Sequence, residues 1–445
     1  MRINPLALLA LVGAVTLQTA CSSSHNAGLP SIAQPAQTGQ VVASNPSTRK
    51  PLDIGAFPTA IDAFPTDIGA FPTDSNAFPV CSSGNTQCHS QYRSDISPNA
   101  NPNLPPSQIA GYHPSDLQNA YGLYSAQWAG QGQTVAVITA FDAPMLASDL
   151  AVYRAAFGLP PCPPANYNGG GHWKGGCLNV VYANGNQPQP SFAWDIEATL
   201  DAEMVSAICP QCNIMIVEAQ DDMISSLSNA VAVAAQNGAT EISNSYAVPE
   251  TDTSTRQYAS NYNQAAQWGI PITASAGDAG YGTAFPASLN SVIAVGGTSL
   301  INAPGYGWAS AVWPGTGSGC AMWGNKPSYQ TDLGCLTSRT MNDLAVVADP
   351  ATGVSAYVSP VGGWAVFGGT SVGAPIVAGM YALAGGVRPN GGPVNNAASL
   401  YRNSSQFNPV TPRANGTCAV SLLCNGGLGF TGPSGLGSPY GLGAF

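Results

Sequence analysis

The chain has 445 residues, of which 8% are charged and 44% are apolar, and its net charge is −10 because Lys and Arg together number only 12. No basic patch is visible in the sequence, which excludes nucleic acid as an expected partner. Low charge with many apolar residues favours a compact, loop-rich extracellular protein over a disordered one. The first hundred residues lack core-forming patterns, so we expect one large domain in the remainder.

Residues 1–21 predict an export signal. Arg2 gives a positive start, and the apolar run from Leu6 to Leu17 is too short to cross a bilayer comfortably. Ala20-Cys21 followed by three serines is similar to a bacterial lipoprotein cleavage site, which favours lipidation of Cys21, with simple secretion as the alternative. We therefore expect an outer-membrane lipoprotein or a secreted protein that meets a membrane only through a lipid anchor.

Residues 22–104 are expected to form a Pro-rich tether of low complexity. Phenylalanines recur every seven residues in AFP or AFPT units, at Phe57, Phe64, Phe71 and Phe78. The proline in each unit excludes a helical heptad, so the repeat predicts an extended spacer. A docking repeat for a partner is the alternative. The sequence indicates neither the oligomeric state nor whether the tether is removed.

Ten cysteines remain when Cys21 is assigned to the lipid. They fall into five close pairs: Cys81–Cys88, Cys162–Cys177, Cys209–Cys212, Cys320–Cys335 and Cys418–Cys424. Local pairs in an even number are typical of an oxidising compartment, so each pair is expected to form a disulfide. The CxxC spacing of the third pair also occurs in zinc and redox sites, but no second CxxC or nearby histidine completes a metal set.

Between residues 105 and 445, short apolar strands alternate with helical segments. We expect strands at 134–139, 214–218, 241–245, 270–274 and 291–295, and helices at 114–131 (ending in a glycine turn), 147–157, 194–207, 225–237, 261–268 and 371–385. Such alternation predicts an α/β fold with a doubly wound, mostly parallel sheet and helices on both faces.

Ser371 is the candidate nucleophile. It follows Gly368-Gly-Thr and opens an apolar helix, whose N-terminus favours negative charge near the serine. A simple turn with a helix cap is the alternative. Serine also needs a base. His25 and His89 lie in the predicted tether, and neither His113 nor His172 is on a helix able to face the serine, so a Ser-His-Asp triad lacks a good histidine.

Carboxylates offer a better base. Glu197 and Asp201 are four residues apart on a predicted helix and share one face. Burial and a like charge raise a carboxyl pKa, and such a pair can accept the serine proton at acid pH. A solvated acidic face is the alternative. Asp278 follows a strand in SAGDAG, where a protonated acid can donate to an oxyanion and where an Asx-turn is the alternative.

These three segments, in this order, resemble the sedolisin family of serine-carboxyl peptidases, with matches to a helical Glu-x-x-x-Asp, a strand-end SxGDxG and a late GGTS-x-x-x-P. The resemblance covers about residues 105–445 and implies a subtilisin-like fold. It also implies that Glu197 is the general base, Asp201 its proton partner, Ser371 the nucleophile and Asp278 the oxyanion-hole acid. The family generally carries a large folded pro-segment, for which residues 22–104 are too short.

The resemblance also implies a calcium loop near the C-terminus, and here the chain departs from the family. Pro409 and Thr431 stand where the family has aspartates, which leaves only backbone carbonyls at Val410, Gly427 and Gly429. Calcium prefers charged oxygens among its ligands, so tight binding is expected to be lost and no cofactor is predicted.

Together these features predict an exported endopeptidase that hydrolyses proteins or peptides at acid pH through an acyl-enzyme on Ser371. Two alternatives remain open. One is a surface-anchored binding or scaffold protein that keeps the fold without turnover. The other is a neutral peptidase with His113 or His172 beside the serine.

Overall fold

The computed structural model describes residues 76–445 except 127, 166–174, 304–306 and 386–396. The helices of this part are α1 (Pro114–Ala120), α2 (Leu146–Ala156), α3 (Phe192–Ile208), α4 (Ile224–Gln236), α5 (Asp252–Gln267), α6 (Thr370–Leu383) and α7 (Ala398–Arg402). The strands of the largest sheet are β4 (Thr134–Ala140), β5 (Leu178–Tyr182), β6 (Asn213–Ala219), β7 (Glu241–Asn244), β9 (Ile272–Ser275), β11 (Ile293–Ala303), β12 (Gly307–Val312) and β15 (Leu344–Val347). The remaining strands are β1 (Ala77–Pro79), β2 (Gln87–Cys88), β3 (Gln91–Arg93), β8 (Tyr246–Pro249), β10 (Ala284–Phe285), β13 (Gly319–Cys320), β14 (Thr340–Met341), β16 (Val354–Val358), β17 (Gly363–Gly368), β18 (Phe407–Asn408) and β19 (Ser438–Pro439).

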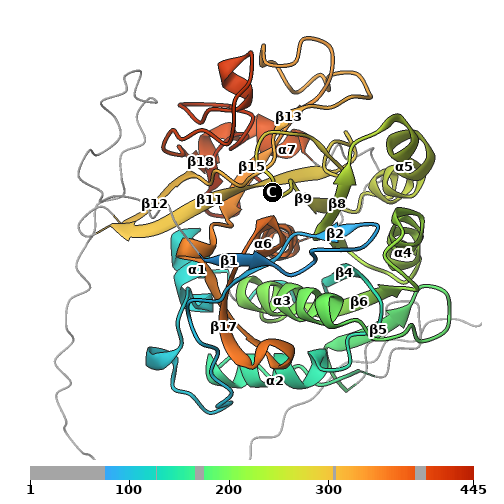
Figure 1. The fold of residues 1–445 in the computed structure, drawn as a ribbon, viewed down its shortest axis with the longest axis vertical. Coiled ribbons are helices and arrows are strands. Elements are labelled where there is room, and N and C mark those ends of the chain that lie inside the picture. Colours follow the sequence, from blue (N-terminus) through green and yellow to red (C-terminus); the bar gives the residue numbers. More distant parts are fainter. Residues whose placement is uncertain (1–75, 127, 166–174, 304–306, 386–396) are drawn as a thin grey trace, which may run out of the picture. The chain divides into compact units, whose positions relative to one another are not determined.

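The central sheet is parallel except at one edge (Figure 1). Its strands follow the order β12-β11-β9-β7-β4-β6-β5, and β15 also pairs with β11. Only β12 runs antiparallel to its neighbour. Strands β6 and β5 lie on one side of β4, and β7, β9 and β11 lie on the other. The predicted fold class, an α/β doubly wound sheet of the subtilisin-like type, is confirmed.

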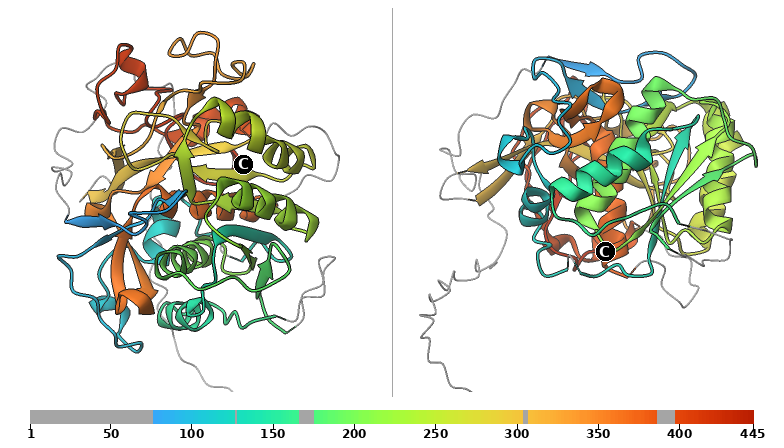
Figure 2. Two further views of the ribbon diagram at one scale, coloured as in Figure 1. Left: turned by 45° about the vertical axis from the view of Figure 1, so that its right-hand side comes forward. Right: turned by 90° about the horizontal axis from the view of Figure 1, so that it is seen from below.

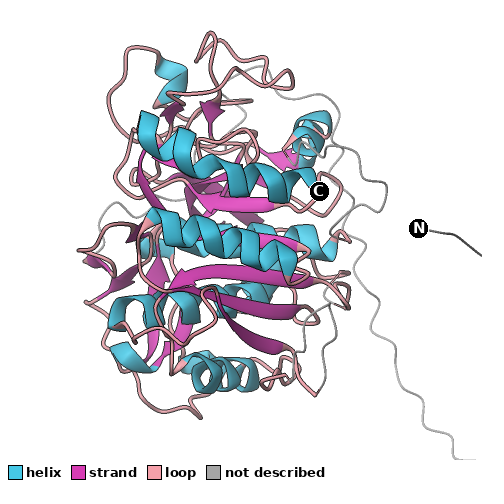
Figure 3. Cartoon of the chain, turned by 90° about the vertical axis from the view of Figure 1, so that its right-hand side faces the viewer, coloured by secondary structure: helices cyan, strands magenta, loops and turns pink. Residues whose placement is uncertain are grey.

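Helices cover both faces of this sheet, with α2, α3 and α6 on one face and α4 and α5 on the other (Figure 3). Side chains of β4 alternate between the two cores. Val135 and Val137 pack in the core of α3 and α6, whereas Ala136 and Ile138 pack in the core of α4. A parallel strand buried on both faces explains why β4 is apolar at nearly every position.

The two helices that carry predicted site residues are buried almost throughout. Every residue of α6 is buried, and so is every residue of α3 from Trp194 to Ile208. The alternative of a solvated acidic face on α3 is therefore wrong, because Asp195 and Glu203 are 4% and 0% exposed. A helix with no solvent face must pair or protonate its carboxyl groups.

Helices begin or end at residues other than predicted mainly where polar residues obscure the apolar periodicity of the helix. Helix α5 starts at Asp252, nine residues before the predicted start, because Thr251 accepts a hydrogen bond from the Ser254 amide and caps a polar first half. Helix α1 ends at Ala120, since Gly122 then takes a positive φ of 66°.

The N-terminal segment corrects the predicted domain boundary. The folded part begins by residue 76 and not at 105, since β3 pairs with β17 and β2 pairs with β8. These strands are two or three residues long and have no apolar period, so their pattern did not distinguish them from a tether. Cys21, Phe57, Phe64 and Phe71 lie outside the described residues; Phe78 lies on β1 and is half-exposed.

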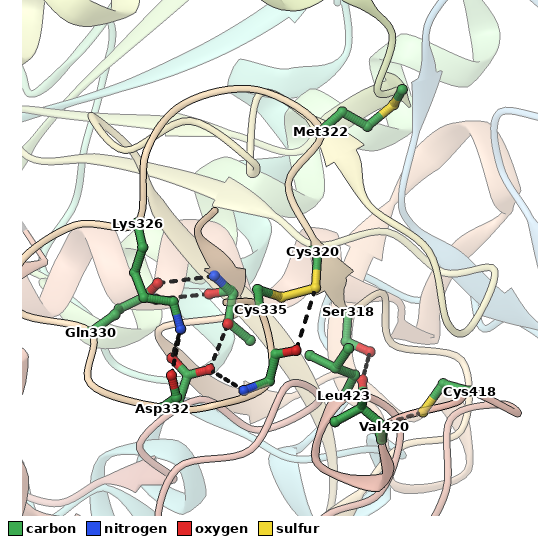
Figure 4. Close-up of a disulfide and its surroundings, with 12 residues drawn as sticks. Ser318, Cys320, Met322, Lys326, Gln330, Asp332, Cys335, Cys418, Val420 and Leu423 are labelled. Carbon is green, nitrogen blue, oxygen red and sulfur yellow. Dashed lines mark hydrogen bonds and ion pairs between the residues drawn. A yellow bond between two sulfur atoms is a disulfide. The ribbon is translucent and has the colours of Figure 1, made fainter. Parts of the chain in front are cut away.

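Five disulfides join cysteines of the described residues, with the pairings that the cysteine spacing predicts. Figure 4 shows Cys320 and Cys335 closing a loop in which the Lys326 ammonium lies 3.0 Å from the Asp332 carboxylate. None of the described helices is long and apolar enough to cross a membrane.

Candidate active site

Ser371 lies in the first turn of α6, fully buried beneath the N-terminal segment. Gly369 precedes the helix with a positive φ of 90°, which a residue with a side chain rarely adopts. The Ser371 hydroxyl donates to the Ser245 carbonyl at 3.1 Å. Pro375 has no amide hydrogen to bond the Ser371 carbonyl oxygen, and the Ser245 hydroxyl oxygen lies 3.3 Å from that oxygen instead. The helix starts at Thr370, one residue earlier than predicted.

Glu197 and Asp201 lie on α3, and both are buried at 1% exposure. The Ser245 hydroxyl donates to Asp201 Oδ1 at 2.8 Å. Burial raises the pKa of Asp201, and the charge of Glu197 raises it further. Burial also raises the pKa of Glu197, an effect only partly offset by the Ser371 and Ser90 hydroxyls and the Ser90 amide close by. Neither Glu197 oxygen has a hydrogen-bond partner within ordinary geometry. Both oxygens of this carboxyl, which lies close to Ser371, are therefore still able to accept a hydrogen bond or a proton.

Asp278 follows β9 and reaches the start of α6. Its Oδ1 accepts from the Thr370 amide and the Thr370 hydroxyl, both at 2.8 Å, and its Oδ2 accepts from Gln91 Nε2 at 3.0 Å. The residue keeps some exposed surface, but its carboxyl end is enclosed, and burial raises its pKa to about 7. At acid pH this carboxyl is protonated and can donate a hydrogen bond beside Ser371.

The structure thus brings all four predicted residues to one place. Parallel strands β7 and β9 end at the same edge of the sheet, and α6 begins there. Ser245, which directly follows β7, contacts Asp201 on one side and Ser371 on the other. Sequence reasoning missed Ser245, although its place at the end of a buried strand was a usable signal.

His89 is the other functional neighbour that sequence reasoning missed. Its amide lies 3.0 Å from the Ser371 hydroxyl oxygen and 3.1 Å from the Ser245 carbonyl oxygen, and its carbonyl accepts from the Ser371 amide at 3.1 Å. Its ring Nδ1 lies 2.9 Å from the Ser275 hydroxyl. Burial of the ring lowers the pKa of His89 to about 4, although the residue as a whole is only partly buried. His89 therefore meets the nucleophile through its backbone.

Of the other three histidines, His113 has a place at the start of α1, and two lie outside the described residues. His113 caps α1, and its ring Nε2 lies 3.0 Å from the Ile109 carbonyl oxygen. His25 and His172 lie outside the described residues. The alternative of a triad that uses His113 gains no support from this geometry.

The residues at the predicted calcium loop do not fit a calcium ion. Pro409 has no side-chain oxygen, and the Thr431 hydroxyl is bonded to the Ser434 hydroxyl at 2.7 Å. The backbone of Thr431 is paired with that of Gly435, and Val410, Gly427 and Gly429 have no side-chain oxygen of their own. Among the described residues no cluster of three acidic, histidine or cysteine side chains could hold a metal.

Chemically, the arrangement offers a nucleophile, a base and an electrophile. A hydroxyl at a helix N-terminus lies next to a buried carboxyl pair, and an amide with a protonatable carboxyl is placed where negative charge would develop on a carbonyl oxygen. His89 contacts the Ser371 hydroxyl through its amide, and its ring Nδ1 faces the Ser275 hydroxyl instead.

Comparison with known proteins agrees with this geometry. The Subtilase family model (Peptidase_S8) matches residues 175–422, more than half of the chain. Kumamolisin of Bacillus sp. (strain MN-32) is 28% identical over 365 residues, which cover 74% of this chain and 62% of kumamolisin. Sedolisin of Pseudomonas sp. (strain 101) is 25% identical over 365 residues, covering 74% of this chain and 60% of sedolisin. The chain thus spans about 60% of the length of these curated relatives.

A solved structure of Pseudomonas sedolisin, a serine-carboxyl proteinase complexed with two molecules of pseudo-iodotyrostatin, superposes with a TM-score of 0.61 at 23% identity. The match covers 75% of this chain and 96% of that chain, and it supports the shared fold. The chain belongs to the subtilase family and, within it, to the sedolisins.

Proposed function

We propose that this protein is an exported serine-carboxyl endopeptidase that hydrolyses peptide bonds at acid pH. The observation that carries the proposal is the meeting of Glu197, Asp201, Asp278 and Ser371 around the buried start of α6. The names of the relatives and the neighbouring structure support a peptidase acting on proteins or peptides. The export signal and the lipid on Cys21 belong to the same proposal, which rests there on sequence alone.

In this mechanism the Ser371 hydroxyl gives its proton to Glu197 while Oγ attacks the substrate carbonyl carbon. The Ser371 amide and protonated Asp278 donate hydrogen bonds to the oxyanion. Glu197 then gives the proton to the leaving amine, the C–N bond breaks, and an acyl-enzyme remains on Ser371. Water attacks the acyl group, again losing its proton to Glu197, and releases a carboxylic acid and free Ser371.

Asp201 holds one proton with Glu197 as a pair. Two carboxyls that share a buried site ionise in two separated steps, and between those steps the pair carries one proton and one negative charge. In that state the pair can act as a base without a histidine. The Ser245 hydroxyl keeps Asp201 in place by its 2.8 Å hydrogen bond.

The test is an assay of the purified full chain on a denatured protein from about pH 3 to about pH 8, followed over time. Glu197→Gln should lower kcat by about 10²-fold to 10⁴-fold, and Ser371→Ala by roughly 10⁴-fold or more. Glu203→Gln is the matched control, because this buried carboxyl lies on the same helix and bonds the Tyr357 amide at 3.0 Å, away from Ser371.

Two outcomes would overturn the proposal. A folded chain without cleavage at any pH would favour the binding or scaffold alternative. Activity that survives Glu197→Gln and peaks at neutral pH would exclude the carboxylate base.

A further inference from the structure

A cavity of about 370 Å³ lies beside the C-terminal end of α3. Its wall comes from α1, from the segment after α1, from the end of α2 and from Pro210, two residues beyond α3. None of the described residues that line it is Asp, Glu, Lys or Arg. The cavity therefore does not select a charged ligand, and its volume is at the lower end of the range of roughly 300–1,000 Å³ that is usual for ligand pockets.

Two large aromatic side chains at this cavity are left mostly uncovered. Trp128 is 70% exposed and Tyr124 is 52% exposed, and Phe157 lines the cavity with them. Exposed apolar surface that gathers at a cavity indicates a binding site, whereas scattered single residues do not. Grooves lined by aromatic side chains bind extended Pro-rich segments, whose conformation is largely fixed before they bind.

The polar side chains at the cavity are bonded within the protein. His113 Nε2 lies 3.0 Å from the Ile109 carbonyl oxygen, and the Gln118 side chain donates to the Ala207 carbonyl at 2.8 Å. The His113 ring also packs against Phe157, with ring centres 4.8 Å apart. These contacts hold the wall in place and leave its aromatic faces to meet a ligand, so the expected ligand is itself built of rings.

The chain carries segments of this chemistry in its AFP and AFPT units, each of which joins a phenylalanine directly to a proline. The units at Phe57, Phe64 and Phe71 lie outside the described residues. The unit at Phe78 is described, and its ring lies against Tyr92 with ring centres 6.5 Å apart. One unit of the repeat thus already packs on an aromatic side chain of the folded domain.

The first described residues lie near one wall of the cavity. Strand β1 pairs with β3, and β3 pairs with β17 (Figure 2, blue and orange). Trp364 on β17 packs edge-on against Phe157, with ring centres 5.5 Å apart. Two strand spacings of about 4.8 Å, a short step along β17 and one ring contact place Asn76 roughly 25 Å from Phe157.

The length of the chain before Asn76 selects one unit of the repeat. An extended Pro-rich segment covers about 3.1 Å per residue, so the five residues from Phe71 to Asn76 span about 15 Å and the twelve from Phe64 span about 37 Å. Phe71 is therefore too close to Asn76 to reach the wall at Phe157. Phe64 is the first phenylalanine, counting back from Asn76, that reaches it.

We propose that Phe64 and Pro65 dock in this cavity of their own chain, with the phenyl ring inside it and the proline ring on Trp128. The contact ties the Pro-rich segment to the side of the domain that carries α1 and α2. Glu197 lies eleven residues before the last residue of α3, about 17 Å along the helix, so docking leaves the catalytic cluster untouched. The inference stands independently of the proposed peptidase function.

The experiment is limited proteolysis of the full Ser371→Ala chain by an endoproteinase that cuts before aspartate, followed by intact mass. Asp62 and Asp67 flank the docked unit, and Asp74 lies beyond it as the internal reference. If the unit binds with a dissociation constant of about 100 µM at an effective concentration on the order of 1 mM, the two flanking cuts should be about tenfold slower than in a chain that also carries Phe64→Ser.

Matched variants show whether the cavity is responsible. Adding Trp128→Ser should speed the flanking cuts as much as Phe64→Ser does. Phe71→Ser removes the same ring from the unit that cannot reach, and Trp268→Ser removes an indole that is 47% exposed at the end of α5, so both should leave the rates unchanged. The peptide acetyl-Ala-Phe-Pro-Thr-amide in millimolar excess should speed the flanking cuts by competition, whereas acetyl-Ala-Ser-Pro-Thr-amide should not.

Three results would overturn the inference. The first is equal cleavage of the chains with and without Phe64→Ser. The second is protection that survives Trp128→Ser, since the unit would then be held elsewhere. The third is protection that fades on roughly hundredfold dilution, because docking within one chain does not depend on concentration and such a loss would assign the unit to a second copy.

Discussion

The catalytic cluster and residues 76–93, here called the strap, both contact the Ser371 hydroxyl, yet they are built in opposite ways. The cluster stands on α3 and α6, whose side chains are buried in one continuous core with the central sheet. The strap has strands of two or three residues, one disulfide and a few hydrogen bonds. A geometry held by core burial opens only when the whole domain unfolds, whereas a segment held by a few local contacts opens at a lower free-energy cost.

The strongest way to sharpen this comparison is to change Asp278, which contacts both regions through Thr370 and Gln91. Asp278→Ala removes one of the two proposed donors for the oxyanion and should lower kcat by about 10²-fold to 10³-fold. Asp278→Asn keeps a donor that does not titrate. The wild type should lose activity as pH rises through about 7, because Asp278 then loses its proton.

Steady-state kinetics of the wild type and the two variants over the pH range measure both effects. We expect Asp278→Asn to retain more activity than Asp278→Ala and to lack the decline near neutral pH. If the two variants behave alike, Asp278 serves only to position Thr370.

The cluster could be predicted from sequence because its signals are local. Glu197 and Asp201 have helical spacing, Asp278 follows an apolar strand, and Ser371 opens an apolar helix. The alternation of strands and helices brings the carboxyl ends of parallel strands to one edge, so short motifs far apart in the chain meet there.

The strap could not be predicted in this way. His89 and Ser371 are 282 residues apart, and nothing periodic in residues 76–93 indicates a partner strand. A Pro-rich composition favoured a tether. The Cys81–Cys88 pair inside that segment was the one signal of ordered structure, since a tether gains nothing from a closed loop.

A second prediction loosens the strap and leaves the cluster unchanged. Asp222→Ala removes both acceptors of Asn85 and should destabilise the strap by about 1–3 kcal/mol. Hydrogen exchange of residues 80–90 should accelerate while that of α3 stays slow. Asp221→Ala is the neighbouring control, because its carboxylate accepts a hydrogen bond from the Met223 amide, two residues along its own loop. Equal protection in wild type and Asp222→Ala would show that the strap is held by other contacts.

A third prediction separates the two regions by pH. Burial raises the pKa of Glu197, Asp201, Glu203 and Asp278, so the folded chain binds their protons more tightly than the unfolded chain. Their stabilisation is fully present below an ordinary carboxyl pKa of about 4 and is lost as pH rises through the folded values. The pKa of His89 is lowered to about 4, so its contribution is present above 6.5 and is lost as pH falls through about 4.

The thermal unfolding temperature of the Ser371→Ala variant should therefore fall by about 5 °C or more between about pH 5 and about pH 8. Exchange of the strap should instead accelerate as the pH drops below about 6, after correction for the intrinsic rate. Adding Glu203→Gln removes one titrating group and should flatten the thermal curve. A core that gains stability up to pH 8 would contradict the assigned direction of these pKa shifts.

The smallest effect is expected at the C-terminal loop, where the family resemblance implies a calcium site and where Pro409 and Thr431 stand at the positions expected for aspartates. With Pro409 and Thr431 in place of aspartates and the Thr431 hydroxyl bonded to Ser434, a calcium ion would meet backbone carbonyls alone. A chelator in excess should shift the unfolding temperature by less than about 1 °C, because a ligand that is not bound adds no stability. A large drop would show that carbonyl oxygens suffice. Thr431→Asp tests the same point from the other side, since restoring one carboxylate should make the unfolding temperature rise with added calcium.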